Sequence, residues 1–374
     1  MPIFIKEVHD KKSWNDFIYL PEIIHKNHEN WVHPLYIDEK KFFSKDRNPA
    51  FGKNETRLLV AYENNKPVGR IMGIIPTAFN EANKLRTARF SYFECYERKE
   101  IFDLLLSEVE TWAKSKKCNQ LIGPMGFSDK EPQGFVTKGF DEPTMLVTNC
   151  SFRFMKEYIE ENDYRPYVEL CQYDLPISSA IIERYQKFAH RVERNHQITV
   201  NEFTNTKSIK PFIKPVFELI NRIYTEIYGF TEVTEAEMEE FAHRFLPLLN
   251  PQLIKIITNA EGKVIAFVIA MPDMSKGIKK AKGRLFPFGW LPIVIEAKTS
   301  KKLMLLLGGV DNEMQNKGLD ALLAIKLFHS ALLLGFKTMD SHLIMKDNVK
   351  MRREIERLEN SRLYKEYAIY RKDL

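Results

Sequence analysis

The residues best suited to chemistry follow an apolar run near the C-terminal end of the chain. Residues 303–307 are five consecutive apolar residues, and Gly308 and Gly309 follow them. A polar, turn-prone segment then leads to Gly318, where a long apolar run begins. The first run suits a strand buried on both faces, and the second suits a largely buried helix. Because unpaired N–H groups and the positive end of a helix dipole meet at such a junction, this segment is predicted to bind an anion.

The elements that position this junction are predicted to occur twice. Residues 57–75 form a β-rich run, a turn with two asparagines and a second run, and residues 253–270 repeat that order. Residues 97–116 have helical apolar spacing and lead into a short apolar strand, as the helix after Gly318 leads into a strand at 337–345. Matched hairpins, helices and strands in one order indicate an internal repeat.

The repeat divides the chain into two halves. In each half, an asparagine stands between the short strand and the next helix. It is Asn149 in the first half and Asn348 in the second. Residues 177–195 are charged, with apolar residues at helical intervals, which is typical of a connecting helix. We therefore predict a first domain at 1–176, a connecting helix at 177–195 and a second domain at 196–374.

Length and composition indicate an ordinary globular protein. The chain has 374 residues, of which 44% are hydrophobic and 28% charged, and this length favours two domains. No apolar run reaches the roughly 18 residues of a membrane span, and the start, MPIFIKEVHD, lacks the order of a secretory signal. We therefore expect a cytoplasmic protein with no membrane partner.

Charge and cysteine usage exclude further classes of site. The formal net charge of +6 is mild and the basic residues form no continuous tract, so a small anionic ligand is expected and a nucleic acid is not. The four cysteines lack the paired spacing of a zinc site or a redox dithiol. They are predicted to be buried free thiols, and no metal site is expected.

One segment combines basic and aromatic residues. Within 277–293, four basic residues precede three aromatic ones, namely Lys279, Lys280, Lys282, Arg284, Phe286, Phe288 and Trp290. Basic residues beside aromatic ones can bind nucleotides or RNA. We favour the alternative of a solvated basic turn that leads into a buried aromatic plug.

The order of elements and the glycine-bearing loop resemble the GCN5-related N-acetyltransferase (GNAT) superfamily. The family loop reads Gln or Arg, two residues, Gly, one residue, then Gly or Ala, and the matching stretch is Gln315, Asn316, Lys317, Gly318, Leu319 and Asp320. Val310 stands where the family usually has a valine at the end of its fourth strand. The resemblance implies an α/β fold (α+β, with a mixed sheet) of two tandem GNAT-like domains. It also implies that the loop holds the pyrophosphate of acetyl-CoA or another acyl-CoA, with Gly309 and Asn348 as further cofactor contacts.

The whole chain also resembles a group of bacterial two-domain proteins built from acetyltransferase-like halves. The first half carries this resemblance in stretches such as PVGRIMG and LIGPMGFSDKEPQGFVTKGFD. A likeness of this kind transfers the fold more strongly than the activity. No glycine lies between Tyr92 and Glu97, so the first half is expected to be degenerate and not to bind coenzyme A.

Two departures from the family pattern concern the chemistry. Asp320 replaces the last Gly or Ala, where a carboxylate either repels a pyrophosphate or favourably caps the positive end of the helix. Ile355 stands where the family often has a tyrosine that acts as general acid. The candidates left for proton transfer are therefore Tyr364, Tyr367, Asp340 and His342.

The expected function is transfer of an acetyl or other acyl group from acyl-CoA to an amine by direct attack. The expected partners are a small-molecule or peptide amine and a second copy of the chain in a homodimer. One alternative is an aminoacyl or peptidyl transferase that uses aminoacyl-tRNA. The other alternative is a binding or scaffold protein that kept the fold and lost the chemistry.

Overall fold

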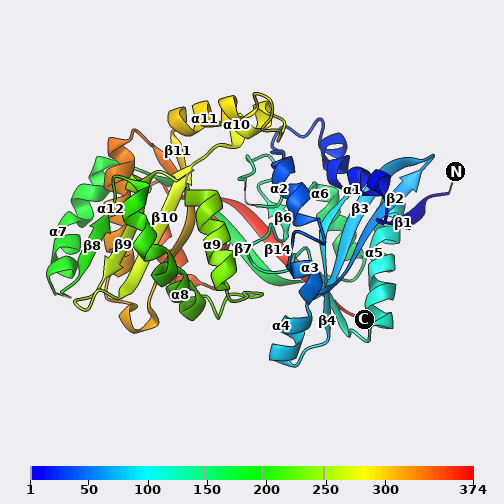
Figure 1. The fold of residues 1–374 in the computed structure, drawn as a ribbon, viewed down its shortest axis with the longest axis horizontal. Helices are drawn as coiled ribbons and strands as arrows, with labels where there is room; N and C mark the ends of the chain where they lie inside the picture. Colours follow the sequence, from blue (N-terminus) through cyan, green and yellow to red (C-terminus); the bar gives the residue numbers. More distant parts are fainter. Residues whose placement is uncertain (1, 147, 196, 247–248) are drawn as a thin grey trace.

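The protein is described from a computed structural model, which describes residues 2–146, 148–195, 197–246 and 249–374. Two lobes lie side by side around a sheet that runs through both (Figure 1). The N-terminus and the C-terminus lie in the same lobe (Figure 1).

The first lobe contains a sheet covered by helices on both faces. Its elements, in chain order, are β1 (Phe4–Glu7), α1 (Lys11–Ile24), α2 (Tyr36–Phe42), α3 (Ala50–Lys53), β2 (Glu55–Glu63), β3 (Lys66–Ile75), α4 (Thr77–Asn83), β4 (Thr87–Cys95), α5 (Lys99–Ser115), β5 (Gln120–Gly123), β6 (Phe135–Lys138), α6 (Arg153–Glu161) and β7 (Arg165–Pro176).

The second half of the chain repeats this plan after the helix α7 (Ser179–Asn195). It contains β8 (Thr199–Glu202), the 3-10 helix η1 (Thr206–Phe212), α8 (Ile213–Ile223), α9 (Glu235–Phe245), η3 (Pro251–Leu253), β9 (Ile254–Thr258), β10 (Val264–Pro272), α10 (Ser275–Lys280), α11 (Trp290–Thr299), β11 (Lys302–Val310), η4 (Asn312–Met314), α12 (Leu319–Leu333), β12 (Thr338–Asp340), β13 (Ile344–Met345), α13 (Val349–Glu356) and β14 (Arg362–Asp373).

The two halves exchange their last strands. Among the described residues the sheet order is β1-β2-β3-β4-β5-β14-β7-β12-β11-β10-β9-β8. The last strand of the second half, β14, pairs with β5 of the first half, and the last strand of the first half, β7, pairs with β12 of the second. The strands β14 and β7 also pair with each other, so one continuous sheet joins the halves. The predicted mixed sheet is confirmed. The strand β7 ends at Pro176, and the division into domains stays a prediction.

The predicted hairpins and long helices are confirmed. The turn between β2 and β3 holds Asn64 and Asn65, both with positive φ, which is the backbone that a tight hairpin needs and that asparagine tolerates. The prediction of one strand at 337–345 is wrong. That segment breaks between β12 and β13, where His342 has φ +60°.

The two asparagines that precede α6 and α13 have different roles. Asn348 is the N-cap of α13, where its side chain accepts a hydrogen bond from the Met351 N–H at 3.2 Å. Asn149 does not cap α6, since its side chain donates to the Gly134 carbonyl at 2.7 Å.

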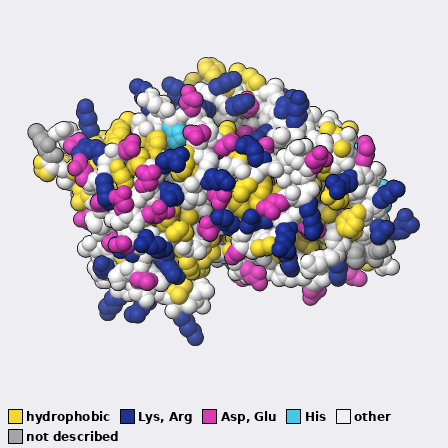
Figure 2. All heavy atoms as spheres, turned by 180° about the vertical axis from the view of Figure 1, so that it is seen from behind, with side chains coloured by type: hydrophobic (Ala, Val, Ile, Leu, Met, Phe, Trp, Pro, Cys, Tyr) yellow, Lys and Arg dark blue, Asp and Glu magenta, His cyan; other side chains and the backbone are white. Residues whose placement is uncertain are grey.

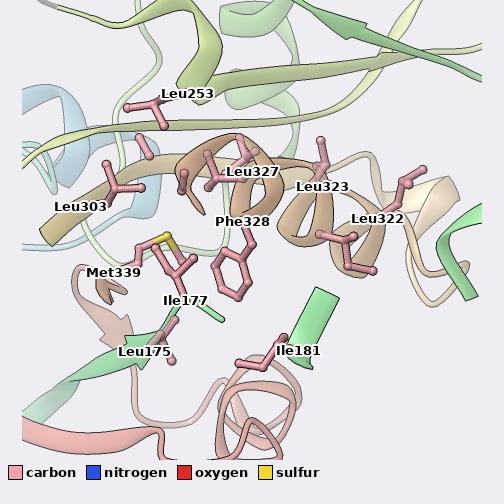
Figure 3. Close-up of a cluster of buried hydrophobic side chains, with 14 of the residues drawn as sticks. Leu175, Ile177, Ile181, Leu253, Leu303, Leu322, Leu323, Leu327, Phe328 and Met339 are labelled. Atoms are coloured by element: carbon pink, nitrogen blue, oxygen red, sulfur yellow. The ribbon is translucent and has the colours of Figure 1, made fainter. Parts of the chain in front are cut away.

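One core cluster of the second half lies between α12 and the sheet. Four residues of α12 belong to the same buried cluster as Leu303 of β11, Met339 of β12 and Leu175 of β7 (Figure 3); they are Leu322, Leu323, Leu327 and Phe328. Ile181 of α7 closes this cluster from the other side. The apolar run after Gly318 is therefore buried against the strand that precedes it, which fixes the loop between them. Within the described part of the chain, no helix combines the length and apolar character of a bilayer crossing.

Candidate functional site

The parallel strands β11 and β12 separate partway along their length. They are paired from Lys302 with Thr338 to Met304 with Asp340. Beyond this point β13 pairs with β7 instead, so β11 keeps only β10 as a neighbour from Leu305 onward. The opening between these strands leads to the end of β11 and the loop before α12.

A β-bulge lies in β11 at the start of the opening. Leu305 pairs with Ala270 and Leu307 pairs with Ile269, so Leu306 has no partner residue in β10. Leu306 and Leu307 consequently lie on the same face, where both pack against the cluster that contains Phe267. A bulge re-aims the backbone groups of its strand, and bulges are common beside active sites.

The loop before α12 presents backbone donors. Asn316 and Gly318 have φ values of +61° and +81°, which bend the backbone sharply before the helix. Among the described residues, the N–H groups of Asn316, Lys317 and Gly318 have no hydrogen-bond acceptor. The N–H groups of the first turn of α12 also point out of the helix end. Within the predicted loop Gln315–Asp320, residues 316–318 thus form a set of free donors beside the exposed Lys317 side chain, while the Gln315 N–H is already bonded to the Asn312 carbonyl.

Two glycines, Gly309 and Gly318, allow the surroundings to approach the backbone closely. A Cβ at Gly309 would lie 2.2 Å from Ile223 of α8, and one at Gly318 would lie 2.5 Å from Phe188 of α7. Gly308 differs, since its nearest neighbour to a Cβ would be 3.6 Å away. The predicted contact Val310 packs against the α12 side of the sheet.

Tyr224, which belongs to no motif in the sequence, reaches the free edge of β11. Its hydroxyl donates to the Gly308 carbonyl at 2.9 Å, and the Gly308 N–H donates to the hydroxyl at 3.3 Å. Burial raises the pKa of Tyr224 to about 12. The hydroxyl therefore satisfies backbone groups that would otherwise face the opening.

Asp320 lies exposed in the first turn of α12. Its carboxylate accepts a hydrogen bond from the Ala321 N–H at 2.9 Å. The side chain therefore stabilises the positive end of the helix, as one of the two sequence interpretations holds.

We expect Asp320→Ala to tighten acyl-CoA binding by about threefold to tenfold, because it removes a negative charge from the end of the helix where a pyrophosphate would bind. Calorimetric titration with coenzyme A measures this change. Glu359→Ala removes an exposed charge elsewhere and serves as the control. Unchanged or weaker binding in Asp320→Ala would mean that the carboxylate acts on the helix alone.

Two of the four proton-transfer candidates are in contact. The Tyr364 hydroxyl donates to the Asp340 carboxylate, which also accepts from the Gln172 amide at 3.1 Å and the His342 N–H at 2.9 Å. Burial raises the pKa of Asp340. Burial and the nearby Asp340 carboxylate raise the pKa of Tyr364 well above its usual range. A tyrosine held in this way is a poor proton donor.

Tyr367 belongs to the same buried network. Its hydroxyl donates to the Gln172 side-chain oxygen at 2.9 Å, and burial raises its pKa above the usual range. Tyr364, Tyr367, Asp340 and Gln172 thus join β14, β12 and β7 across the exchange of strands.

His342 lies at the break between β12 and β13, on the other edge of the opening from β11. Its imidazole has no hydrogen bond within the described residues. Burial lowers the pKa of His342 to about 4. The ring is therefore neutral at physiological pH.

The His342 pKa predicts a pH dependence of stability. The folded-state pKa of about 4 lies below the unfolded value of about 6.5, so the unfolded chain binds more protons between these values. The contribution of His342 to stability is full above about pH 6.5 and falls as the pH drops toward 4. Urea unfolding across this range should show a smaller loss of stability in His342→Gln than in the wild type, and equal slopes would contradict the assignment.

An apolar cavity of about 50 Å³ lies between α8, α9 and the sheet. Its lining residues are all apolar and include Val216 and Ile220 of α8, Ala242 of α9 and Leu307 of the bulged strand. Leu307 connects the cavity to the stretch of β11 where the strands separate. The sequence held no signal for this cavity beyond the apolar face of α8.

The corresponding strands of the first half are closed. β4 and β5 pair from Thr87 with Gln120 to Arg89 with Ile122. Just beyond, the Met125 N–H donates to the Phe90 carbonyl at 2.8 Å. The chain after β5 therefore stays bonded to β4 at the level where β11 and β12 separate in the second half.

One group of described residues could hold a metal ion. The ligand atoms of His25, His28 and Cys150 lie within 4.8 Å of one another. The two imidazoles are joined through their Nδ1 atoms at 3.0 Å, and burial lowers the pKa of His25 well below its usual range. One neutral ring therefore donates to the other. This hydrogen bond accounts for their approach without an ion.

Sequence relatives cover the full length of the chain. No family model matches. The bacterial ceramide synthase of Caulobacter vibrioides is 24% identical over 372 residues, which span 96% of this chain and 94% of the relative. Protein YghO of Escherichia coli is 24% identical over 377 residues, or 98% and 94% of the two chains.

Solved structures share the fold. A tandem GNAT protein from the clavulanic acid biosynthesis pathway has a TM-score of 0.57 and 11% identity, and the match spans 100% of this chain and 98% of that one. A GCN5-related N-acetyltransferase from Sphaerobacter thermophilus has a TM-score of 0.51 and 10% identity, over 99% and 95%. The predicted fold of two tandem GNAT-like halves is confirmed.

Proposed function

We propose that this chain, which has the tandem GNAT fold, is an N-acyltransferase that moves a fatty acyl group from acyl-CoA to the amine of a long-chain lipid. One observation carries the proposal. The strands β11 and β12 separate between a loop of free N–H donors and an apolar cavity. The anionic head of an acyl-CoA thioester would meet the N–H donors of the loop, and its apolar acyl chain would meet the cavity.

The second half would hold the coenzyme. The N–H groups of Asn316, Lys317 and Gly318 suit the pyrophosphate, and the free edge of β11 suits the amides of the pantetheine arm. At Gly308 the Tyr224 hydroxyl already uses the backbone groups, so an amide that binds there must displace it. The Asn348 side chain already accepts a hydrogen bond as the cap of α13, so a contact with the coenzyme would have to use its amide nitrogen.

The apolar cavity, of about 50 Å³, has room for only part of a long acyl chain, and its apolar lining suits methylene groups. Its lining offers no polar side chain to an acetyl group, and Leu307 places it at the opening. The name of one full-length relative, a ceramide synthase, points the same way, since a ceramide is the amide of a fatty acid and a long-chain amino alcohol. The acceptor would therefore be an amine on an apolar chain.

The reaction would be a direct transfer. The neutral amine nitrogen attacks the thioester carbonyl carbon, the C–N bond forms, the C–S bond breaks, and coenzyme A leaves as the thiolate. A backbone N–H at the Leu306 bulge would stabilise the oxyanion. Of the four candidates, His342 is the one on the edge of the opening with a free neutral ring. We therefore assign His342 as the base that accepts the proton from the attacking amine. Its low pKa makes it a weak base, so the amine must bind uncharged.

The first half would not bind a second coenzyme. Its strands are closed by the Met125–Phe90 hydrogen bond, and its glycine-free turn before α5 lacks the donors of the loop before α12. It would instead support the acceptor side of the site through the exchanged strands.

Titration of the chain with acetyl-CoA and palmitoyl-CoA tests the proposal. We expect a heat of binding and a rise in Tm with both, and the larger rise with palmitoyl-CoA, because a ligand that binds only the folded state stabilises it. The absence of both signals at millimolar coenzyme would contradict the proposal and favour a scaffold protein.

A further inference from the structure

The connection between β10 and β11 is an insertion that its counterpart lacks. Residues 273–301 hold α10 and α11, whereas the equivalent connection of the first half, residues 76–86, holds only α4. The insertion lies along the upper edge of the molecule (Figure 1).

α11 and the residues before it are apolar and exposed. No residue of α11 is buried, and Phe286 and Phe288 are 77% and 74% exposed. We call the following set the exposed α11 surface: Phe286, Phe288, Trp290, Leu291, Val294 and Ile295. The prediction of a buried aromatic plug at these positions is wrong. Isolated exposed apolar residues are ordinary, but a contiguous group of this size marks a binding surface.

The packing of α11 fixes this orientation. Ile293 and Ala297 pack inward, against the cluster that contains the bulge residue Leu306. A Cβ on Gly277 of α10 would lie 2.5 Å from the Pro292 carbonyl, so the two helices are in close backbone contact. The apolar residues therefore point outward because the opposite face of α11 is already used.

Basic side chains surround the exposed α11 surface. Residues 275–299 contain five lysines and one arginine against one glutamate. Arg284 is paired with Glu22 at 2.7 Å. Four of the lysines are exposed and have no ion pair among the described residues, namely Lys276, Lys280, Lys282 and Lys298. Figure 2 shows apolar side chains with basic ones beside them along the same upper edge of the molecule.

The first half extends the same surface. The Tyr36 N–H donates to the Gly283 carbonyl at 3.0 Å. Ile23 and Ile37, the chain neighbours of Glu22 and Tyr36, are both exposed. The loop that joins α10 to α11 is thus anchored on the first half beside two more exposed apolar side chains.

We propose that the exposed α11 surface binds the interface of an anionic membrane, with its aromatic residues among the lipid headgroups and the unpaired lysines on lipid phosphates. Aromatic and aliphatic side chains beside lysines are the features of helices that lie in a membrane interface. This binding needs no spanning helix. It also stands apart from acyl transfer, since it is measured without any substrate.

Co-sedimentation of the full chain with vesicles tests the proposal. We expect binding to phosphatidylcholine vesicles with about one third phosphatidylglycerol, and weak binding to pure phosphatidylcholine. The double variant Phe286→Ser, Phe288→Ser should lower the affinity at least about tenfold. Lys280→Gln should lower it by about fivefold, and raised salt should do the same.

Matched controls separate membrane binding from other effects. Leu333→Ser removes an equally exposed side chain, 76% exposed, from α12 and should leave vesicle binding unchanged. Lipids that carry bromine should quench the wild-type fluorescence more than that of Trp290→Phe. Equal binding by the double variant and Leu333→Ser, or no binding to anionic vesicles, would overturn the proposal. A dimer that the double variant dissociates, without vesicle binding, would assign the surface to contact between copies.

Discussion

Gly318→Val is expected to weaken acyl-CoA binding at least about a hundredfold, a loss of about 3 kcal/mol. Gly318 has φ +81°, and a Cβ there would lie 2.5 Å from Phe188 and 3.1 Å from Val192. A β-branched residue cannot keep this backbone without strain. The N–H groups that would hold the pyrophosphate must therefore move. Calorimetric titration with coenzyme A measures the loss.

Gly335→Val provides the matched control. Gly335 follows the other end of α12 and also has positive φ, +83°, but a Cβ there would meet only the Lys301 ammonium at 3.4 Å. Both variants should lose stability to backbone strain, while only Gly318→Val should lose coenzyme binding. Equal affinities of the two variants for coenzyme A would remove the loop before α12 from the site.

Ala242→Phe is expected to lower kcat/KM for palmitoyl-CoA about a hundredfold and to leave acetyl-CoA turnover within about threefold. Ala242 lines the apolar cavity from α9 and is only partly buried, so a phenylalanine there blocks the cavity with part of its ring left outside the core. A filled cavity excludes a long chain but not a methyl group. Turnover of both thioesters with one amine acceptor measures the ratio.

Ala236→Phe tests whether the position or the residue type matters. Ala236 is exposed on the same helix and does not line the cavity. Ala236→Phe should keep the wild-type ratio of palmitoyl-CoA turnover to acetyl-CoA turnover. A parallel loss for both thioesters in Ala242→Phe, or no loss for either, would show that the acyl chain binds elsewhere.

Features with a local signal were predictable from the sequence. The hairpin of β2 and β3 follows from two β-rich runs around Asn64 and Asn65, which adopt positive φ readily. The strand, glycine loop and helix from Leu303 to Leu333 follow from a switch between extended and helical apolar patterns.

Features set by distant partners were not predictable. The exchange of β7 and β14 depends on which strands meet after folding, and both sequences are ordinary strands. The bulge at Leu306 lies within a run of apolar residues that reads the same in any register. His342 has a left-handed backbone conformation, and a histidine in an apolar stretch does not predict one.

The orientation of α11 was misread for a physical reason. An apolar segment is expected to be buried because exposure of its side chains to water is unfavourable, and the sequence of Phe286, Phe288 and Trp290 predicts a buried plug for that reason. That inference holds only where water is the sole surroundings of the protein. Under the membrane proposal, lipid headgroups surround the exposed α11 surface, and its apolar side chains need not be buried within the protein.

Mass spectrometry of the reaction product tests the central claim most directly. The purified chain would be incubated with palmitoyl-CoA and a long-chain amino alcohol, with release of the coenzyme thiol measured in parallel. We predict one palmitoyl amide formed for each thiol released, and loss of both in Gly318→Val but not in Gly335→Val. Thiol release without an amide, or no release above the rate without protein, would contradict N-acyl transfer by this fold.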